Sequence, residues 1–509
     1  MRHLLSSAQM RDLDSRTIKE FGLPARVLME NAGRACAEAI IDHYPEKLAG
    51  VICVICGSGN NGGDGAVIAR CFRNWGCEVL IIQTGKGSPS PEAQVNLALC
   101  EKLEIPILPI SSTEELDLAK KIISNSSLVV DAIIGTGFKG ALKPWLNEFF
   151  DLVNICAEFI VAVDIPSGLD ADTGYCENSI EAEATIAVAT MKTGHVTGRG
   201  KEVCGEIHWV DIGIPSLYYR DLKTVKLYQG SDFCPPPRLP EFHKNDFGKV
   251  YVFGGIPGYT GASVMAAHAA LRAGCGYVYV LHRIELMAVY ALKLTEALSL
   301  ALPELPDSGE PDTQTLLHLL SDASAVLIGP GLGRDDYSLK LLETVLKNIE
   351  VPVVVDADGI NLISENPDLY EYLSRPNILL TPHWGEFARL ANIDKDDLEK
   401  DCLGTLRAFT RKHPTRILLK SHFSVYHDSE QTLVNTSGND GLATGGSGDV
   451  LAGIIASFLA QNESIPDAAI KASYLLGQTA ENLARKRGTA SILPTDIIAN
   501  LFLIDKEEQ

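Results

Sequence analysis

Residues 444–449 combine three glycines, a carboxylate and the start of a helical pattern. Glycine has no Cβ, so this backbone can adopt positive φ and bring its N–H groups close to an anion. Apolar residues recur at helical spacing from Val450, which places those N–H groups at a helix N-terminus that favours phosphate. Asp449 could then accept a proton from a substrate hydroxyl during phosphoryl transfer. The alternative is that Asp449 only caps the helix.

A second glycine-rich loop, residues 57–65, follows the apolar run 51–56 and precedes a helical pattern over 66–75. A strand, a glycine loop and a helix in that order form a phosphate cradle, and this loop matches G-x-G-x-x-G. A dinucleotide-dependent dehydrogenase also needs an acidic residue at the end of the second strand. Here that strand, residues 77–83, ends in Ile-Ile-Gln-Thr, which argues against ordinary hydride transfer.

Polar side chains follow the strand patterns of the first half at the points where the strands end. The near-continuous apolar runs at 128–135 and 159–164, separated by helical stretches, predict a parallel sheet covered on both faces. Ligands of such sheets collect at the carboxyl ends of the strands. The residues at these ends are Asn60, Asn61, Asp64, Asp131, Asp164 and Ser167. They could bind a hard cation together with a polar ligand, or each could be a turn or cap residue.

The second half of the chain repeats this organisation and predicts another α/β domain. Strand signals recur at 250–253, 276–281, 325–329, 352–356, 377–381 and 417–420. Polar loops follow four of these strands, at 329–333, 356–361, 381–386 and 420–424. The chain contains no G-x-x-x-x-G-K-[ST], so a P-loop is excluded as its phosphate-binding device.

A proline-rich connection separates the two halves. Its Pro-Pro-Pro run at 235–237 cannot continue a helix or supply a sheet with N–H donors. We therefore predict one domain over 1–215, a linker over 216–240 and a second domain over 241–509. The first domain is expected to begin with two helices within 7–41, because helical spacing is broken at 22–24.

Composition and charge limit the partners that this chain can have. The formal charge of -21 at pH 7 argues against nucleic acid and against an anionic membrane. No apolar run approaches the ~20 residues that span a bilayer, and no signal-peptide pattern is visible, so we expect a cytoplasmic protein. The cysteines are expected to be reduced core residues. Cys53 and Cys56 would point to opposite faces of one strand, which argues against a shared metal or a redox pair.

The motifs of the first half resemble the YjeF N-terminal domain, the NAD(P)HX epimerase. They are Gly-Ser-Gly-Asn-Asn-Gly-Gly-Asp-Gly, Asp-Ala-Ile-Ile-Gly-Thr-Gly and Val-Asp-Ile-Pro-Ser-Gly-Leu-Asp. The resemblance implies that the damaged dinucleotide contacts Asn60, Asn61, Gly62, Gly63, Asp64, Gly135, Thr136, Gly137, Phe138, Lys139, Gly140, Ala141 and Asp164. It implies that Asn61, Asp131 and Ser167 ligate potassium. Asp164 would be the catalytic acid/base group.

The second half resembles the ribokinase-like superfamily and, more closely, the YjeF C-terminal domain, the ADP-dependent NAD(P)HX dehydratase. Gly-Pro-Gly-Leu-Gly, Thr-Pro-His-x-Gly-Glu and the stretch around 439–451 carry this resemblance. It implies that Ala262, Gly331, His383 and Asp449 contact the hydrated dinucleotide, with Asp449 catalytic. It implies that the adenine nucleotide contacts Lys420, Ser421, His422, Phe423, Ser424 and Gly448. The chain departs from the family pattern at Trp384, where proline is usual, and at 420–422, where a Lys-Gly-Ala-type start is usual.

Together the resemblances imply a bifunctional enzyme that repairs hydrated nicotinamide nucleotides. An N-terminal Rossmann-like domain with K⁺ would interconvert the C6 epimers of NAD(P)HX. A C-terminal ribokinase-like domain would dehydrate the S epimer with Mg²⁺ and ADP, giving AMP and phosphate. We expect a homo-oligomer with no nucleic-acid or membrane partner. The alternatives are a hydroxymethylpyrimidine- or sugar-type kinase with a regulatory N-terminal domain, and an N-terminal domain that only binds another protein.

Overall fold

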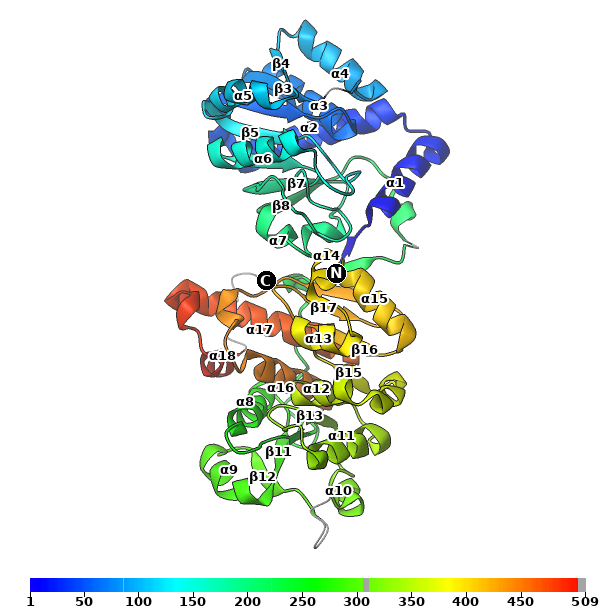
Figure 1. The fold of residues 1–509 in the computed structure, drawn as a ribbon, viewed down its shortest axis with the longest axis vertical. Coiled ribbons are helices and arrows are strands. Elements are labelled where there is room, and N and C mark those ends of the chain that lie inside the picture. Colours follow the sequence, from blue (N-terminus) through cyan, green and yellow to red (C-terminus); the bar gives the residue numbers. More distant parts are fainter. Residues whose placement is uncertain (86, 221, 305–310, 502–509) are drawn as a thin grey trace. The chain divides into compact units, whose positions relative to one another are not determined.

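The computed structural model describes residues 1–85, 87–220, 222–304 and 311–501. The chain divides into two compact units, an N-terminal unit that includes His3–Val225 and a C-terminal unit that includes Lys226–Leu398 and the residues from Leu403 onward. Each unit contains a mostly parallel β-sheet with helices packed on it (Figure 1). The predicted α/β class with two parallel-sheet cores is therefore confirmed.

All neighbouring strands in the sheet of the N-terminal unit are parallel, in the order β4-β3-β2-β5-β6-β7-β8. The strands are β2 (Val51–Cys56), β3 (Glu78–Thr84), β4 (Ile107–Ile110), β5 (Ser126–Ala132), β6 (Ile160–Val163), β7 (Ala184–Val188) and β8 (Glu206–Val210). A short β1 (Arg2–Leu4) precedes them in the chain and is not part of this sheet. Because these strands run the same way, the residues that follow them meet at one edge.

Helices cover both faces of this sheet and bury a separate apolar cluster on each. One face carries α1 (Ser7–Arg16), α2 (Ala25–His43), α3 (Asn60–Asn74) and α4 (Pro91–Lys102), and the other carries α5 (Leu116–Ile123) and α6 (Pro144–Cys156). The shorter helices are η1 (Thr17–Phe21), η2 (Pro45–Ala49), η3 (Thr113–Glu115), η4 (Thr193–His195), α7 (Gly200–Val203) and η5 (Ser216–Tyr219). Cys56 belongs to the first cluster and Cys53 to the second, as their odd spacing on β2 predicts.

The glycine-rich motif after β2 differs from the expected loop, because α3 already begins at Asn60. Its glycines allow close backbone packing rather than positive φ. A Cβ on Gly57 would lie 1.9 Å from the Ile133 carbonyl oxygen, and one on Gly62 would lie 2.0 Å from the Gly57 carbonyl oxygen. The missing side chains therefore let the first turn of α3 sit directly against the end of the sheet.

The larger sheet has the order β1-β9-β18-β17-β16-β15-β14-β13-β10-β11-β12. It is parallel from β16 to β12, whereas β16, β17 and β18 pair antiparallel. Its strands are β9 (Val225–Leu227), β10 (Lys249–Phe253), β11 (Tyr277–His282), β12 (Leu298–Ala301), β13 (Ala325–Ile328), β14 (Val353–Val355), β15 (Ile378–Leu380), β16 (Arg416–Leu419), β17 (Ser424–His427) and β18 (Thr432–Asn435). β9 falls within the range expected to be a linker.

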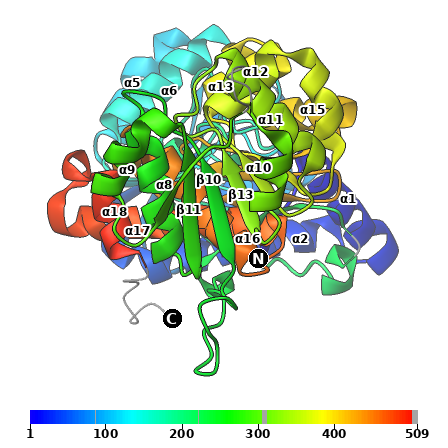
Figure 2. The same cartoon turned by 90° about the horizontal axis from the view of Figure 1, so that it is seen from below.

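Helices also cover both faces of the second sheet, with α8 and α11 on opposite sides of β10 and β13 (Figure 2). The α-helices are α8 (Thr260–Arg272), α9 (Met287–Lys293), α10 (Thr313–Leu319), α11 (Asp336–Asn348), α12 (Asp358–Glu365), α13 (Trp384–Ala391), α14 (Lys395–Lys400), α15 (Cys402–Lys412), α16 (Ser447–Ala460), α17 (Ile465–Arg487) and α18 (Pro494–Asn500). The shorter ones are η6 (Gly230–Asp232), η7 (Ile284–Leu286), η8 (Pro367–Ser374), η9 (Asp440–Leu442) and η10 (Thr489–Ser491).

The central helix α16 begins at Ser447, three residues before the position where its apolar pattern starts. Gly446 precedes it with φ +106°, a left-handed conformation that a side chain would strain. A Cβ at Gly446 would also lie 2.6 Å from the terminal methyl of Met265 on α8. Asp449 therefore lies in the first turn of α16, where the helix dipole favours negative charge.

No helix within the described part of the chain is both long enough and apolar enough to cross a membrane.

Candidate active sites

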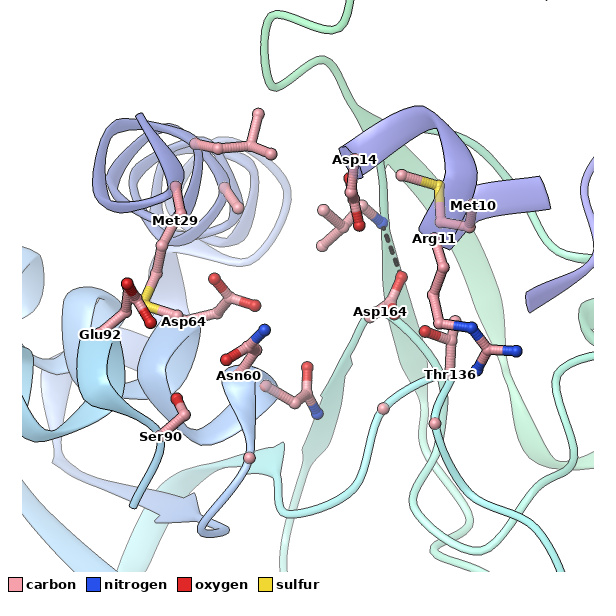
Figure 3. Close-up of a pocket in the computed structure, with 18 of the residues that line it drawn as sticks. Met10, Arg11, Asp14, Met29, Asn60, Asp64, Ser90, Glu92, Thr136 and Asp164 are labelled. Atoms are coloured by element: carbon pink, nitrogen blue, oxygen red, sulfur yellow. Dashed lines mark hydrogen bonds between the residues drawn. The ribbon is translucent and has the colours of Figure 1, made fainter. Parts of the chain in front are cut away.

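A cavity of about 650 Å³ lies in the N-terminal unit at the carboxyl ends of its strands. Asn60 and Asp64 in the first turns of α3 line one side of it, and Asp164, which follows β6, lines the other (Figure 3). Helix α1 adds Met10, Arg11 and Asp14 to the lining. The topology thus brings together residues from three parts of the sequence, two of which follow strands as the strand-end argument predicts.

Asp164 forms a buried ion pair with Lys192, a residue that the sequence analysis did not single out. The Lys192 side chain is only 1% exposed and also donates to the Val188 carbonyl oxygen at 2.7 Å. Asp164 has φ +69°, an uncommon conformation for a residue other than glycine. Its backbone N–H donates to the Ile186 carbonyl at 2.8 Å, so β7 holds this turn in place.

His195 forms hydrogen bonds with the backbones of both residues of this ion pair. Its Nδ1 accepts a hydrogen bond from the Lys192 backbone N–H at 2.8 Å, so Nε2 carries the proton and donates to the Asp164 carbonyl at 2.7 Å. Burial and then the charge of Lys192 lower the pKa of His195 to about 4. The imidazole is therefore neutral at physiological pH and acts as a brace between the two residues.

Two further carboxyl groups face the same cavity. Burial, followed by the charge of Asp164, raises the pKa of Asp14 to about 6. The same two causes raise the pKa of Asp64 well above its usual value. Neither side chain makes a hydrogen bond to any residue that the structure describes. These carboxyls are consequently available to a ligand.

The predicted dinucleotide residues divide into those that line the cavity and those that do not. The lining ones are Asn60, Asn61, Asp64, Gly135, Thr136, Gly137 and Asp164. Gly62 and Gly63 instead pack against Gly57 and the Met29 side chain. Phe138, Gly140 and Ala141 line a separate cavity of about 30 Å³. Lys139 forms ion pairs with Asp170 at 2.8 Å and Asp172 at 2.9 Å.

The three predicted potassium ligands lie in the same region, and all are buried. Asp131 accepts hydrogen bonds from the Ser167 hydroxyl at 2.6 Å and from the Ser167 and Ile133 backbone N–H groups at 2.8 and 3.2 Å. Burial raises the pKa of Asp131 to about 6 despite these bonds. The Asn61 amide nitrogen is buried without a hydrogen-bond partner among the described residues. Among those residues no group of three or more His, Cys, Asp or Glu side chains is arranged to hold a metal ion.

The C-terminal unit brings a lysine and a carboxylate together at the ends of neighbouring strands. Lys420, after β16, forms a 2.6 Å ion pair with Asp356, after β14. Thr381, which follows β15 between them, donates to the same Asp356 oxygen at 2.9 Å. Burial alone would lower the pKa of Lys420, but the charges of Asp356 and Glu386 outweigh burial and raise it. Lys420 is therefore a fixed positive charge beneath the site.

Asp449 and Lys420 meet at the start of α16. A Cβ on Gly448 would lie 3.3 Å from the Lys420 ammonium nitrogen. Burial, then the charge of Asp356, raises the pKa of Asp449 to about 7, while Lys420 opposes the shift. Asp449 makes no hydrogen bond within the described residues, so capping of α16 does not explain it. The neighbouring Ser447 hydroxyl is buried and also lacks a partner there.

His383 caps α13 through one ring nitrogen, and its other ring nitrogen lies 3.5 Å from a Glu386 carboxylate oxygen. Its Nδ1 accepts from the backbone N–H groups of Gly385 at 2.9 Å and Glu386 at 3.3 Å, so its proton is on Nε2. Burial and then the charge of Lys420 lower the pKa of His383. The side chain is 55% exposed, so a neutral imidazole N–H faces solvent at the carboxyl end of β15.

The other predicted residues of the C-terminal unit occupy different environments. Ala262 lies in the first turn of α8, and the buried Gly331 has φ +63° in the turn after β13. Ser421 is half-buried and His422 is exposed in the bend after β16, Ser424 is the first residue of β17, and the Phe423 side chain is buried. The two departures from the family pattern are neighbours, because the Trp384 and His422 rings lie 6.4 Å apart.

Three residues of these sites were missed, although the sequence contains a signal for two of them. Asp14 is four residues after the buried Met10, so it shares a face of α1 with an apolar residue. Asp356 ends a strand that the sequence reasoning recognised. Lys192 carried no such signal, because β7, the strand before it, was not recognised.

Comparisons with known proteins agree for both units. Residues 25–194 match the family model of the YjeF-related protein N-terminus, and residues 250–502 match that of the NAD(P)H-hydrate dehydratase. The bifunctional NAD(P)H-hydrate repair enzyme of Moorella thermoacetica is 36% identical, and the match covers 97% of this chain and 95% of that protein. The Escherichia coli enzyme of the same name is 35% identical, with 96% and 91% covered.

Two solved structures are each similar to about half of this chain. A ribokinase-like superfamily protein from Enterococcus faecalis is 28% identical, with 54% of this chain and 94% of that chain covered and a TM-score of 0.48. An ADP/ATP-dependent NAD(P)H-hydrate dehydratase from Bacillus subtilis, co-crystallised with ATP and Mg²⁺, is 24% identical, with 55% and 98% covered and a TM-score of 0.46. The full-length matches decide the assignment: this chain belongs to the family of bifunctional NAD(P)H-hydrate repair enzymes.

Proposed function

We propose that the N-terminal unit interconverts the C6 epimers of NAD(P)HX and that the C-terminal unit returns the S epimer to NAD(P)H at the expense of ADP. The N-terminal reaction is supported by the cavity with its Asp164–Lys192 pair. The observation that carries the C-terminal reaction is the position of Asp449 in the first turn of α16 beside Lys420. A carboxylate and a helix N-terminus side by side suit phosphoryl transfer to a hydroxyl.

Epimerisation requires the carbinolamine of NAD(P)HX to open and close. The Asp164 carboxylate takes the proton of the C6 hydroxyl, the C6–N1 bond breaks with its electron pair going to N1, and C6 becomes an aldehyde carbon. Rotation about C5–C6 turns the other face of the aldehyde toward N1, and reclosure there gives the other epimer. One proton leaves oxygen and another must reach N1, and reclosure returns both.

Lys192 acts as a positioning residue for Asp164. The ion pair holds the Asp164 carboxylate at the cavity wall, where it can reach a substrate hydroxyl. The second hydrogen bond, to the Val188 carbonyl, fixes the ammonium group at the end of β7. Since Lys192 is almost fully buried, it holds the carboxylate without competing for substrate.

The cluster of Asn61, Asp131 and Ser167 fits a potassium ion. Its donors are oxygen atoms, which hard cations prefer. The pKa of Asp131 is shifted by burial and by hydrogen bonds, and no positive charge among the described residues contributes to the shift. The unpartnered amide of Asn61 could turn its oxygen toward a cation. Bound potassium would supply the missing positive charge and hold the turns after β5 and β6 together.

Replacing potassium by lithium is expected to slow epimerisation and to lower the melting temperature. An ion that binds only the folded state stabilises it by about 2.7 kcal/mol at a concentration roughly one hundred times its Kd. The difference between the two salts should disappear in Asp131→Asn, which lacks the buried charge. Equal melting temperatures of the unchanged protein in both salts would contradict the assignment.

Dehydration needs a better leaving group than hydroxide. Asp449 takes the proton of the C6 hydroxyl. At the same time the C6 hydroxyl oxygen attacks the terminal phosphorus of ADP, and AMP leaves. The N1 lone pair then expels phosphate, and loss of a proton from C5 restores the C5–C6 double bond. The backbone N–H groups at the start of α16 and the Lys420 ammonium group stabilise the transferring phosphoryl charge.

The carboxylates near Lys420 fit a magnesium ion that arrives with the nucleotide. Magnesium in nucleotide sites usually takes one or two carboxylates and completes its shell with phosphate oxygens and water. Asp356 and Asp358 both raise the pKa of Asp449, which places their negative charges close to the phosphate path. The ion would neutralise phosphate charge, while the predicted contacts of 420–424 hold the adenine nucleotide.

The pH dependence of dehydration is expected to report Asp449. Its base form is needed, so kcat/KM should rise about tenfold per pH unit at low pH and level off above about 7, the value to which burial and Asp356 raise its pKa. Because the charge of Lys420 opposes that shift, Lys420→Met should move the bend to higher pH. A profile that is flat from pH 5 to 8 would exclude Asp449 as the base.

An absorbance assay tests the proposed function directly. The protein is mixed with hydrated NADH as a mixture of epimers, with Mg²⁺ and either ADP or ATP. Complete recovery of the absorbance of reduced nicotinamide with ADP supports both activities. No recovery with either nucleotide, together with nucleotide consumption only in the presence of an alcohol, would show a small-molecule kinase instead.

A further inference from the structure

Asp14 is a carboxyl group of the N-terminal cavity that the mechanism above leaves unused. It belongs to α1, far in sequence from the motifs of the sheet edge, and it lines the cavity together with Asp164. Figure 3 shows both carboxyls on the side of the opening that faces Asp64 and Asn60. The inference below rests on the proposed epimerase function and extends its machinery.

Helix α1 directs Asp14 into the cavity. Ser6 caps the helix through its hydroxyl, and Gln9 completes the capping box, so the start of α1 is well defined. Leu13 and Met10 are buried, which fixes the rotation of the helix against the sheet. Met10, Arg11 and Asp14 then occupy one surface of α1 and line the cavity. No described residue engages the Asp14 side chain in a hydrogen bond.

The geometry of a carbinolamine requires two proton-carrying groups close together. Its hydroxyl oxygen and N1 are bonded to the same carbon, C6, so the base for one and the acid for the other must lie side by side. Lys192 forms an ion pair with Asp164, and the charges of both residues shift the pKa of Asp14. The two carboxyl groups are therefore neighbours in the cavity lining. A single wall of the cavity thus presents both groups.

We propose that Asp14 is the second catalytic residue of the epimerase site, the acid that protonates N1 while Asp164 takes the hydroxyl proton. On ring opening the Asp14 proton moves to N1, which holds the electron pair of the broken C6–N1 bond. On reclosure Asp14 takes this proton back as N1 attacks the aldehyde, and the oxygen regains the proton held by Asp164. No oxidant, reductant or further reactant is needed.

The surroundings of Asp14 support this role. Burial and the charge of Asp164 raise its pKa to about 6, so a substantial fraction is protonated in mildly acidic solution. The titratable and charged groups that face it are Arg11 on its own helix and, from the elements around it, Asp64, Asp164, Lys192 and Tyr219. The charge of Asp164 favours the protonated form, and the charge of Lys192 opposes it.

The test compares pH profiles of epimerisation in the full-length protein, followed by chromatographic separation of the two epimers after subtraction of the uncatalysed rate. In the unchanged protein kcat/KM should fall as pH rises through about 6, because the acid form of Asp14 is lost. Asp14→Asn should lower kcat by about 10²-fold or more, and its kcat/KM should no longer fall as pH rises through this range. Asp14→Glu should restore part of kcat together with this fall of kcat/KM.

Asp12→Asn is the matched control, because Asp12 lies on the exposed side of the same helix with a side chain that is 60% exposed. It should keep both the rate and the profile. An Asp14→Asn protein with an unchanged profile, or with a higher KM and unchanged kcat, would overturn the proposal and leave Asp14 a structural or binding residue. If the unchanged protein shows no epimerisation above background, the proposed function itself fails, which is a distinct result.

Discussion

Asp449→Asn is expected to lower the rate of ADP-dependent dehydration by about 10²- to 10⁴-fold, because asparagine cannot accept the hydroxyl proton. The substitution preserves the size of the side chain in the first turn of α16. It also removes a carboxylate whose pKa is raised to about 7 by burial and neighbouring charge, so the fold should not be weakened at pH 8. The measurement is the recovery of absorbance from purified (S)-NADHX with saturating ADP.

Two controls separate chemistry from structure in this experiment. Asp440→Asn changes an exposed carboxylate in the same glycine-rich stretch, one that bonds the Thr489 hydroxyl at 3.0 Å, and it should dehydrate at the normal rate. Epimerisation by the Asp449→Asn protein should be unaffected, because that site lies in the other unit. Normal dehydration by Asp449→Asn would show that another group takes the proton and that Asp449 serves only the start of the helix.

The predictable part of the fold consists of its central strands. β2, β5 and β6 and, in the C-terminal sheet, β10 and β13 are short apolar runs that are buried on both faces, and such runs are visible in the sequence. β8 at the edge of its sheet and β12 at the edge of the other contain only exposed and half-buried residues. Their sequences resemble ordinary surface segments because only part of each strand is buried.

Glycine-rich motifs were located correctly but their local structure was not. Both were expected to be loops before a helix, whereas α3 begins at Asn60 and α16 at Ser447. The reason is that glycine serves two different purposes. Gly446 provides a left-handed turn, but Gly57 and Gly62 allow backbones to touch at distances that a Cβ would forbid. A sequence alone does not distinguish conformational freedom from close packing.

The strand-end argument identified groups of residues but not their partners. It placed Asp164 and Lys420 at sheet edges, yet their ion-pair partners are Lys192 and Asp356, which lie 28 and 64 residues away in sequence. Such pairs form only when parallel strands bring distant turns together, and the order of strands is a property of the whole sheet. Asp14 shows the same limit, since a helix outside the sheet delivers it to the cavity.

Asp164→Asn is expected to lower the rate of epimerisation by about 10²- to 10⁴-fold while dehydration of the S epimer continues. Asparagine is the informative substitution because the residue has φ +69°, a conformation that asparagine adopts more often than alanine does. With a mixture of epimers and excess ADP, the unchanged protein should recover all of the absorbance. The variant should stop at the fraction that was S at the start, apart from slow uncatalysed exchange.

The height of that plateau distinguishes a lost epimerase from a damaged protein. A variant that misfolds would slow the first phase as well, whereas loss of the Asp164 base leaves the first phase intact and removes only the second. Lys192→Met provides the companion measurement, because it removes the buried ammonium group that holds the Asp164 carboxylate in place. It should slow the second phase and leave the first phase intact. If Asp164→Asn reaches full recovery at the normal rate, Asp164 is not the base, and the ion pair with Lys192 is a structural feature of the cavity wall.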